Sequence, residues 1–123
     1  MNTIDVQVET EFLGEKLSPT NQTLYAFSYT VHITNNGEFP MTLRSRYWRI
    51  TNGNGETSDV SGDGVVGEQP TILPQETYTY TSMSFLETQV GTMEGFYDFE
   101  CLHTPAYRAN IPLFRLSATN ILH

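Results

Sequence analysis

Cysteine and basic residues are scarce in this sequence, and each scarcity excludes a class of protein. The single cysteine, Cys101, leaves no pair for an internal disulfide and no set for a cysteine-based zinc site. Such a chain suits a reducing compartment, so we predict a cytoplasmic protein. Lysine and arginine together number 6 against 14 aspartates and glutamates, which gives a net charge of −8. We expect no nucleic-acid partner, because neutralising a phosphate backbone requires clustered cations.

Long apolar runs are missing as well. No stretch reaches the roughly 20 apolar residues that a membrane-spanning helix needs, and residues 1–6 have no basic region of the kind that begins a secretory signal. We therefore expect a soluble protein with no membrane partner. A length of 123 residues fits one domain, 1–123, which is large enough to bury a hydrophobic core.

Helical periodicity is absent, whereas the alternation of apolar and polar residues that is typical of half-buried strands recurs along the chain. Threonine, tyrosine, phenylalanine and valine, which favour strands, dominate the apolar runs. Segments rich in glycine, asparagine and proline separate these runs and predict turns. We predict strands at residues 4–12, 24–34, 41–51, 77–85, 96–101 and 111–117, and a short edge strand at 71–73. We predict loops at 13–21 and 56–69, the second with at most a short strand.

The alternation changes phase inside the third predicted strand. Met41 and Leu43 share one parity, whereas Trp48 and Ile50 share the other, which predicts a β-bulge around Ser45. Trp48 is then the natural anchor of the core. Seven or so short antiparallel strands predict an all-β sandwich or small barrel, and a central inward Trp is typical of immunoglobulin-like sandwiches.

Residues 62–70, named here the glycine block, spell Gly-x-Gly-x-x-Gly through Gly62, Gly64 and Gly67. A dinucleotide fingerprint requires a buried strand before the glycines and a helix after them. Residues 57–61 are mostly polar, and Pro70 and Pro74 follow the last glycine, so neither element is predicted. No lysine lies where a Walker motif needs one. We predict a folded loop whose geometry is set by its glycines.

Two ligand hypotheses remain open for this region. An anion such as a nucleotide or pyrophosphate would use backbone amides and nearby arginines; the residues of that set are Gly62, Gly64, Gly67, Arg44 and Arg46. A divalent cation would use carboxylate oxygens; that set is Asp59, Asp63 and Glu68. The carboxylate spacing matches no calcium loop, and Asp63 and Glu68 would repel a polyphosphate.

No catalytic set emerges from the remaining candidates. The serines lack a nucleophile-elbow setting, and Cys101 lies inside a predicted strand, where a small buried hydrophobe is the usual interpretation. The histidines are scattered and lack the paired spacing of a metal site. We expect no enzyme activity, no cofactor and no specific metal. The side chains considered are Ser45, Ser82, Ser84, Cys101, His32, His103 and His123.

Several segments follow one another along the chain in this order: residues 45–52, the glycine block with its unbroken Gly-Val-Val-Gly-Glu-Gln-Pro, and residues 80–82, 91–97 and 111–116. In this order they resemble the ApaG family of bacterial proteins, over nearly the whole chain. The resemblance implies an immunoglobulin-like or fibronectin type III-like β-sandwich of about seven to eight antiparallel strands. It also implies a link to cobalt tolerance and magnesium efflux, and proximity to diadenosine tetraphosphate metabolism. Similar domains occur in a eukaryotic F-box protein and a DNA-polymerase-interacting protein, where protein–protein interaction is the expected role.

The chain departs from the expected family pattern at Tyr47, where we expect a histidine before the tryptophan. This departure weakens any metal role at that position. Residues 102–108 also look individual, so the loop before the last strand is expected to have its own shape. We therefore predict a non-enzymatic binding or regulatory module that meets an unidentified protein partner or a second copy of itself. The alternative is a divalent-cation or nucleotide sensor built on the glycine block.

Overall fold

The computed structural model describes residues 3–102 and 104–118, which form eight antiparallel strands and no helix. The strands are β1 (Ile4–Leu17), β2 (Thr23–Asn35), β3 (Met41–Asn52), β4 (Thr57–Asp63), β5 (Thr71–Ile72), β6 (Thr77–Leu86), β7 (Val90–Cys101) and β8 (Thr104–Ser117). The all-β prediction is therefore confirmed. In the described part of the chain, we find no helix with the length and apolar character that crossing a membrane requires.

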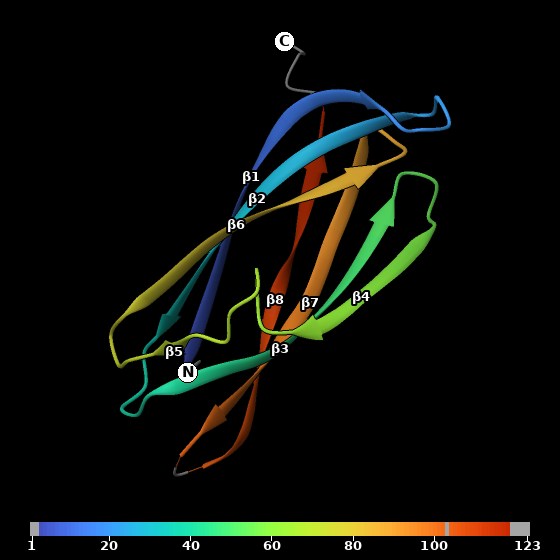
Figure 1. The fold of residues 1–123 in the computed structure, drawn as a ribbon. Helices are drawn as coiled ribbons and strands as arrows, with labels where there is room; N and C mark the ends of the chain where they lie inside the picture. Colours follow the sequence, from blue (N-terminus) through green and yellow to red (C-terminus); the bar gives the residue numbers. More distant parts are fainter. Residues whose placement is uncertain (1–2, 103, 119–123) are drawn as a thin grey trace.

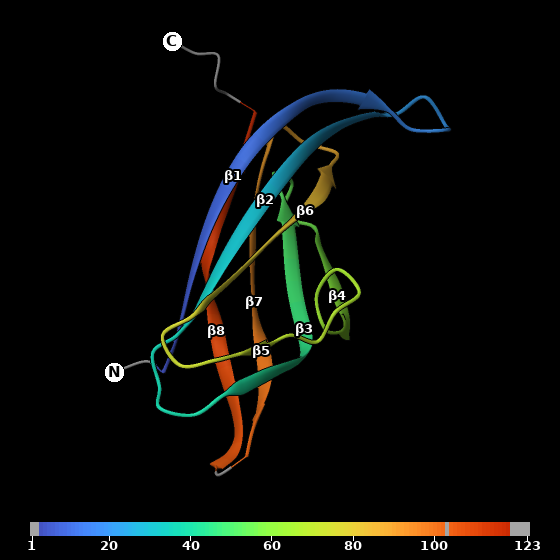
Figure 2. The same ribbon diagram turned by 60° about the vertical axis from the view of Figure 1, so that its left-hand side comes forward.

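The strands form two sheets that pack face to face (Figure 1). One sheet has the order β1-β2-β6, and the other has the order β4-β3-β7-β8, with β5 paired to β3. The turned view in Figure 2 separates the two layers. β1 lies beside β8 on one side of the sandwich, whereas β6 and β4 are the edge strands of the opposite side. This arrangement is compatible with the predicted immunoglobulin-like or fibronectin type III-like sandwich.

The core lies between the sheets and is built from alternate residues of the strands. In β2, Phe27, Val31 and Ile33 are almost fully buried, while the intervening polar residues are partly exposed. Trp48 is 2% exposed, and its ring lies 5.4 Å from that of Tyr29 between centroids. The predicted role of Trp48 as core anchor is confirmed.

Bulges explain where the predicted strand boundaries are right and where they are wrong. The pairing of β3 with β7 shifts register between Leu43 and Ser45, which confirms the predicted bulge. A second shift, between Phe12 and Gly14, lies in the pairing of β1 with β2. The loop predicted at residues 13–21 is therefore wrong in its first part, since β1 continues to Leu17. The bulge interrupts the alternation, and the pattern no longer reveals the strand beyond it.

The predicted loop at residues 56–69 is also wrong in part, because residues 57–63 form β4. This edge strand pairs with β3 from Thr57 to Asp63, yet its side chains are almost all exposed. With no buried face, β4 has no apolar alternation in its sequence. β7 and β8 likewise begin earlier than predicted, at Val90 and Thr104. Most of the segment 102–108 thus belongs to β8 rather than to a separate loop.

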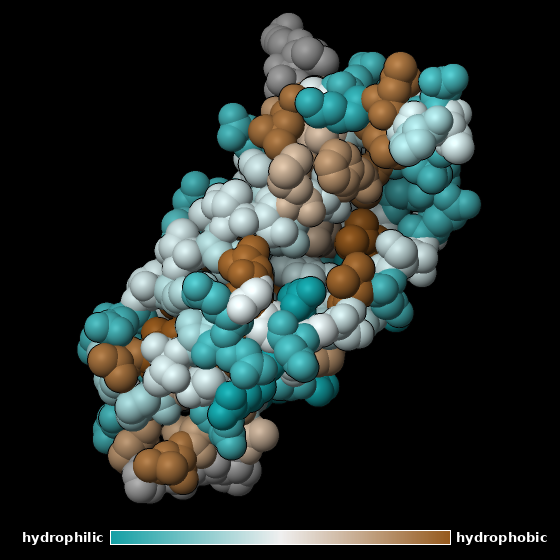
Figure 3. Space-filling view, viewed as in Figure 1, coloured by the Kyte–Doolittle hydropathy of each residue, from teal (hydrophilic) through white to brown (hydrophobic). Residues whose placement is uncertain are grey.

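Apolar side chains lie among polar ones on the face that shows β4, β6 and the glycine block. Figure 3 shows brown and tan side chains next to one another in the upper part of this face, and single brown ones among pale and teal side chains below. Exposed apolar residues of these segments are Val60, Val66, Met83 and Phe85. Exposed apolar groups are ordinary on a folded protein, so a binding surface has to be identified from other features.

Candidate functional site

The glycine block is a tight backbone turn that follows β4. Val65 and Glu68 bond each other through both backbone groups, at 2.8 and 2.9 Å from nitrogen to oxygen. The two residues between them have positive φ, 41° at Val66 and 81° at Gly67, which is the signature of a type I′ turn. Val65 is fully buried and holds the turn against the core. The structure therefore has no strand–glycine–helix geometry at this point.

Gly64 is required by a close approach of the backbone. Its φ is 63°, and a Cβ atom placed there would lie 2.1 Å from the carbonyl oxygen of Glu68. Gly67 has a left-handed φ but open space around its α-carbon. Gly64 is therefore needed both for its conformation and because a side chain would clash, whereas Gly67 is needed for its conformation alone.

The side chain of Arg46 supports the backbone of the glycine block through hydrogen bonds. Its Nη1 donates to the carbonyl oxygens of Asp63 and Gly64, at 3.0 and 2.9 Å. The guanidinium lies against Gly62, where an added Cβ would come within 3.0 Å of Nη1. Arg46 thus meets backbone carbonyls and not a converging set of amides. Phosphate cradles use the opposite arrangement, in which backbone amides point at the anion.

Three of the block's own amides are also occupied. The amide of Gly64 donates to the carbonyl of Arg44 at 2.8 Å, and those of Val65 and Glu68 are used in the turn. An incoming anion would have to replace these bonds. The predicted anion set is thus partly brought together in space, but most of its donors bond to the protein itself.

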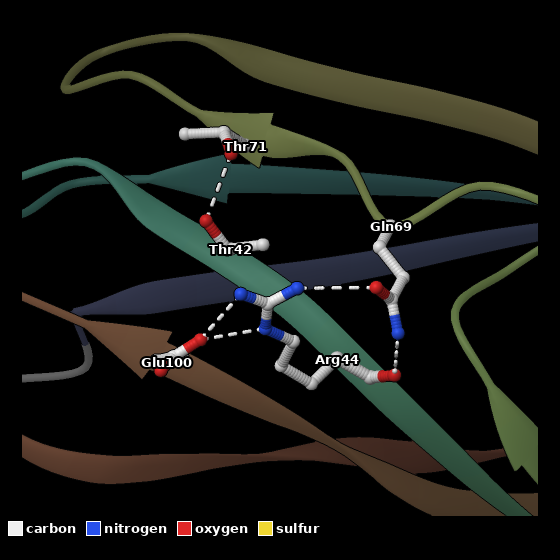
Figure 4. A network of polar contacts seen from close by, with 5 residues as sticks. All are labelled: Thr42, Arg44, Gln69, Thr71 and Glu100. Carbon is white, nitrogen blue, oxygen red and sulfur yellow. Dashed lines mark hydrogen bonds and ion pairs between the residues drawn. The ribbon is translucent and has the colours of Figure 1, made fainter.

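Arg44 belongs to a polar network on the outer surface of β3, shown in Figure 4. Its Nε and Nη2 lie 2.6 Å from Oε1 of Glu100 on β7, and Nη1 donates to Oε1 of Gln69 at 3.1 Å. Gln69 returns a hydrogen bond from Nε2 to the Arg44 carbonyl at 3.0 Å. The network ties the end of the glycine block to two strands of the larger sheet.

The predicted cation set is not gathered into a site. Asp59 pairs with Arg49 at 3.4 Å, and Glu68 accepts a hydrogen bond from the Tyr78 hydroxyl at 3.0 Å. Asp63 lies four residues beyond Asp59 on the same strand, about 13 Å along a β-strand. Among the described residues, no group of three or more His, Cys, Asp or Glu side chains could hold a metal ion.

The remaining polar candidates have structural surroundings. His32 bonds Glu9 at 3.0 Å and Thr79 at 2.9 Å on the outer face of the smaller sheet. Ser84 is buried, and Cys101 is half-buried. His103 and His123 lie outside the described residues.

An outward-facing aromatic group on the larger sheet was not predicted from the sequence. Tyr47 and Phe96 are neighbours on β3 and β7, with their rings stacked at 5.0 Å between centroids. Arg108 of β8 lies over Phe96 at 3.7 Å and bonds Asp98 at 2.8 Å. The hydrogen bond that Arg108 donates to the Asp98 carboxylate raises the pKa of Arg108 above its ordinary value. The inward position of Trp48 was the available signal, since its neighbour Tyr47 must then face outward.

Two hollows flank this aromatic group, one of about 340 Å³ beside Glu94 and Asn110 and one of about 440 Å³ beside Ser61 and Asp63. Both are open to solvent and lie on the outer surface of the sheet. Aromatic and paired charged groups thus lie side by side on this outer surface.

Comparison with known proteins gives a consistent result. The family model of the ApaG domain matches residues 15–101. Protein ApaG of Shewanella sediminis is 46% identical over 122 residues, covering 99% of this chain and 96% of that protein. Protein ApaG of Escherichia coli O1:K1 / APEC is 44% identical over 118 residues, covering 96% and 94%. An X-ray structure from the Northeast Structural Genomics Consortium, target SoR45, superposes with a TM-score of 0.92 at 44% identity, covering 98% of this chain and 91% of that one.

Proposed function

The chain belongs to the ApaG family, and we propose that it acts in the cytoplasm as a non-enzymatic module that binds another protein. The observation that carries this proposal is the tip of the glycine block. The side chain of Val66 is 55% exposed there while its backbone holds a left-handed φ. Strained residues of this kind cluster at functional sites. An exposed apolar side chain on a braced turn is suited to contact with a protein surface.

The way in which the block is held supports a rigid recognition element. Arg46 bonds two of its carbonyls, Val65 is buried beneath it, and Gln69 ties its far end to Arg44. A contact residue on such a turn loses little conformational entropy when it binds, which favours affinity.

The same internal bonding disfavours the competing candidate, a nucleotide or divalent-cation sensor. Arg44 and Arg46 already bond protein oxygens, and the described residues gather no metal-holding group. We propose that the family link to cobalt tolerance and magnesium efflux operates through the protein partner and not through an ion bound to this chain.

Affinity capture from bacterial lysate with the wild-type protein, Val66→Lys and Leu113→Lys tests the proposal. Leu113 is a matched control, since its side chain is 59% exposed on β8. We expect a protein that is retained by wild type and by Leu113→Lys and is lost with Val66→Lys. Calorimetry with cobalt, magnesium, ATP and diadenosine tetraphosphate is run in parallel. A micromolar isotherm with one of these, and no captured protein, would establish the sensor instead.

A further inference from the structure

Five of the described strands lie at a sheet edge, and four of them carry features that block the addition of another strand; one of these, β5, has only two residues. Unpaired edges invite pairing with other chains, and proteins guard them with charges, prolines, bulges or short length. β1 has a bulge and acidic side chains such as Glu9 and Glu11. β4 is short and carries Asp59 and Asp63. β8 contains Pro112, beside a break in its pairing with β7.

β6 has none of these guards. Its 10 residues, Thr-Tyr-Thr-Tyr-Thr-Ser-Met-Ser-Phe-Leu, include no charged residue and no proline. Its pairing with β2 runs from Thr77 to Leu86 without a register shift. Among the strands that the structure describes, β2 is its only sheet neighbour. β6 is thus a long, regular and uncharged edge.

The hydrogen-bonding groups that β6 offers can be assigned from its register. The amide of Asn35 donates to the carbonyl of Glu76, and the Asn35 carbonyl accepts from the amide of Gln75. Both backbone groups of Asn35 therefore point toward the β6 side, and every second residue along an antiparallel ladder does the same. The next residues that bond β2 are therefore the inward-facing ones. The backbone groups that point away from β2 belong to Thr77, Thr79, Thr81, Met83 and Phe85.

The threonine contacts agree with this assignment. Thr30 and Thr81 meet through their hydroxyls at 2.8 Å, as do Thr34 and Thr77. Residues of non-hydrogen-bonded pairs lie closest across an antiparallel ladder, so short hydroxyl contacts are expected at these positions.

The charges at the ends of β6 select the occupant of this edge. Glu76 and Glu87 flank the strand, and both are exposed. A second copy would bring its own net charge of −8 against the same charge on this chain, and surfaces of like charge repel one another. An extended segment with basic ends meets attraction at Glu76 and Glu87.

We propose that the free edge of β6 adds an extended segment of another protein, uncharged and β-branched at its centre and with lysine or arginine at both ends. The proposal rests on the protein-binding function proposed above and specifies how the partner docks. Backbone hydrogen bonds supply affinity in this mode, and pockets for alternate side chains supply specificity.

A pocket for such side chains lies beside the proposed strand. A hollow of about 230 Å³ opens between the end of β6 and the start of β4, lined in part by Ile50, Ser58 and Phe85. Val60 of β4 is paired with Trp48 of β3, so its side chain lies on the inner face of the same sheet, and it is 42% exposed. Side chains of valine or isoleucine size on the inner face of an added strand would cover these apolar groups.

The test uses the synthetic peptide Lys-Arg-Thr-Val-Thr-Val-Thr-Val-Arg-Lys and an analogue with glutamate at all four basic positions. Binding is followed by backbone amide shifts and by amide hydrogen exchange of the whole chain. We expect the basic peptide to slow exchange at Thr79, Thr81 and Met83, because those amides become hydrogen-bonded. The acidic analogue should bind about tenfold more weakly or worse, since opposed rim charges change affinity by amounts of this order.

Thr81→Pro removes one edge-facing amide while leaving the ladder to β2 intact, and it should abolish binding of the basic peptide. Ser61→Pro is the matched control, because its amide also points to a free edge, that of β4; this variant should bind like wild type. Met83→Lys is a second variant that leaves the backbone unchanged and adds a repelling charge to the edge. Fluorescence of Trp48 reports whether each variant is folded.

Several results would overturn the strand-addition proposal. These are no binding of the basic peptide at millimolar concentration, equal binding by the acidic analogue, or binding unaffected by Thr81→Pro and Met83→Lys. Sedimentation that shows a dimer with these amides protected in the absence of peptide would assign the edge to a second copy. Shifts centred on Val66 would leave the protein-binding function in place and remove only this docking mode, so the two proposals fail separately.

Discussion

Val66 holds a backbone conformation that a β-branched residue rarely adopts. Its φ of 41° lies in the left-handed region, where such strain costs on the order of 1–3 kcal/mol. Asparagine tolerates this region and favours type I′ turns. Val66→Asn should therefore raise the free energy of unfolding by about 1 kcal/mol. Urea denaturation followed by Trp48 fluorescence measures the change.

Glycine substitutions in the same turn give the comparison. Gly64→Ala should lower stability by more than about 2 kcal/mol, since the new methyl group meets the Glu68 carbonyl. Gly67→Ala should cost only about 1 kcal/mol, because nothing lies near its α-carbon. If Val66→Asn were no more stable than wild type, the turn would carry no strain at Val66, and strain would no longer support a contact role for this residue.

Prediction at the residue scale succeeded where a backbone conformation requires one particular residue type. The sequence predicts a folded loop at the glycine block, and Gly64 and Gly67 have the positive φ that glycine permits. It did not predict the same conformation at Val66, because valine disfavours it and only the surrounding contacts impose it. The partners of Arg46 were equally hidden, since they are backbone carbonyls and carry no side-chain signal.

At the scale of elements, Arg46 connects β3 to the turn that follows β4. Arg46→Ala removes both hydrogen bonds to the carbonyls of Asp63 and Gly64, and bonds from a charged donor contribute about 1.5–3 kcal/mol. The partly exposed position reduces this, so we expect a loss of about 2 kcal/mol in stability. Amide exchange at Val65 and Glu68 should also become faster, because the turn loses its support.

Arg49→Ala is the control for the Arg46 variant. Arg49 of β3 makes an exposed pair with Asp59 of β4, and pairs of this kind contribute about 0–1 kcal/mol. Equal effects of the two substitutions would show that the carbonyl contacts of Arg46 do not support the turn. In that case Arg46 would be available to a ligand, and the anion hypothesis would gain weight.

Elements were predictable from the sequence where one face is buried. β2 and β6 alternate without interruption, and their predicted bounds are close to those observed. β4 has no buried face, so its polar residues resemble a loop, and the bulge in β1 breaks the period on which prediction depends. The free edge of β6 is a property of strand order, which local periodicity does not contain.

At the scale of the whole molecule, the two sheets are joined by a core of aromatic side chains that was predictable in type but not in contacts. Strand count and the inward Trp48 predict a sandwich, which the two observed sheets confirm. The sequence does not predict that Tyr80 and Tyr97, on opposite sheets, hydrogen-bond to each other through their hydroxyls. That contact depends on how the sheets are placed on one another.

This tyrosine pair predicts how the folded protein responds to alkaline pH. Burial is the main cause that raises the pKa of both Tyr80 and Tyr97 above the ordinary value of 10.0. In the unfolded chain both ionise near pH 10, whereas the folded protein keeps both neutral. Their contribution to stability is thus fully present below pH 10 and is lost as pH rises above it.

With two protons released on unfolding, the free energy of unfolding should fall by about 2.7 kcal/mol per pH unit above pH 10. Urea denaturation between about pH 9 and about pH 11.5 measures this fall, and absorbance at about 295 nm reports the ionised tyrosine, since phenolate forms in roughly this pH range. Tyr97→Phe should reduce the slope to about half, since one buried hydroxyl remains. Lys16 is the only lysine, so lysine titration adds little to the signal in this range. If every tyrosine instead ionised near pH 10 while the protein stayed folded, the buried pair would not hold the sheets together in its neutral form.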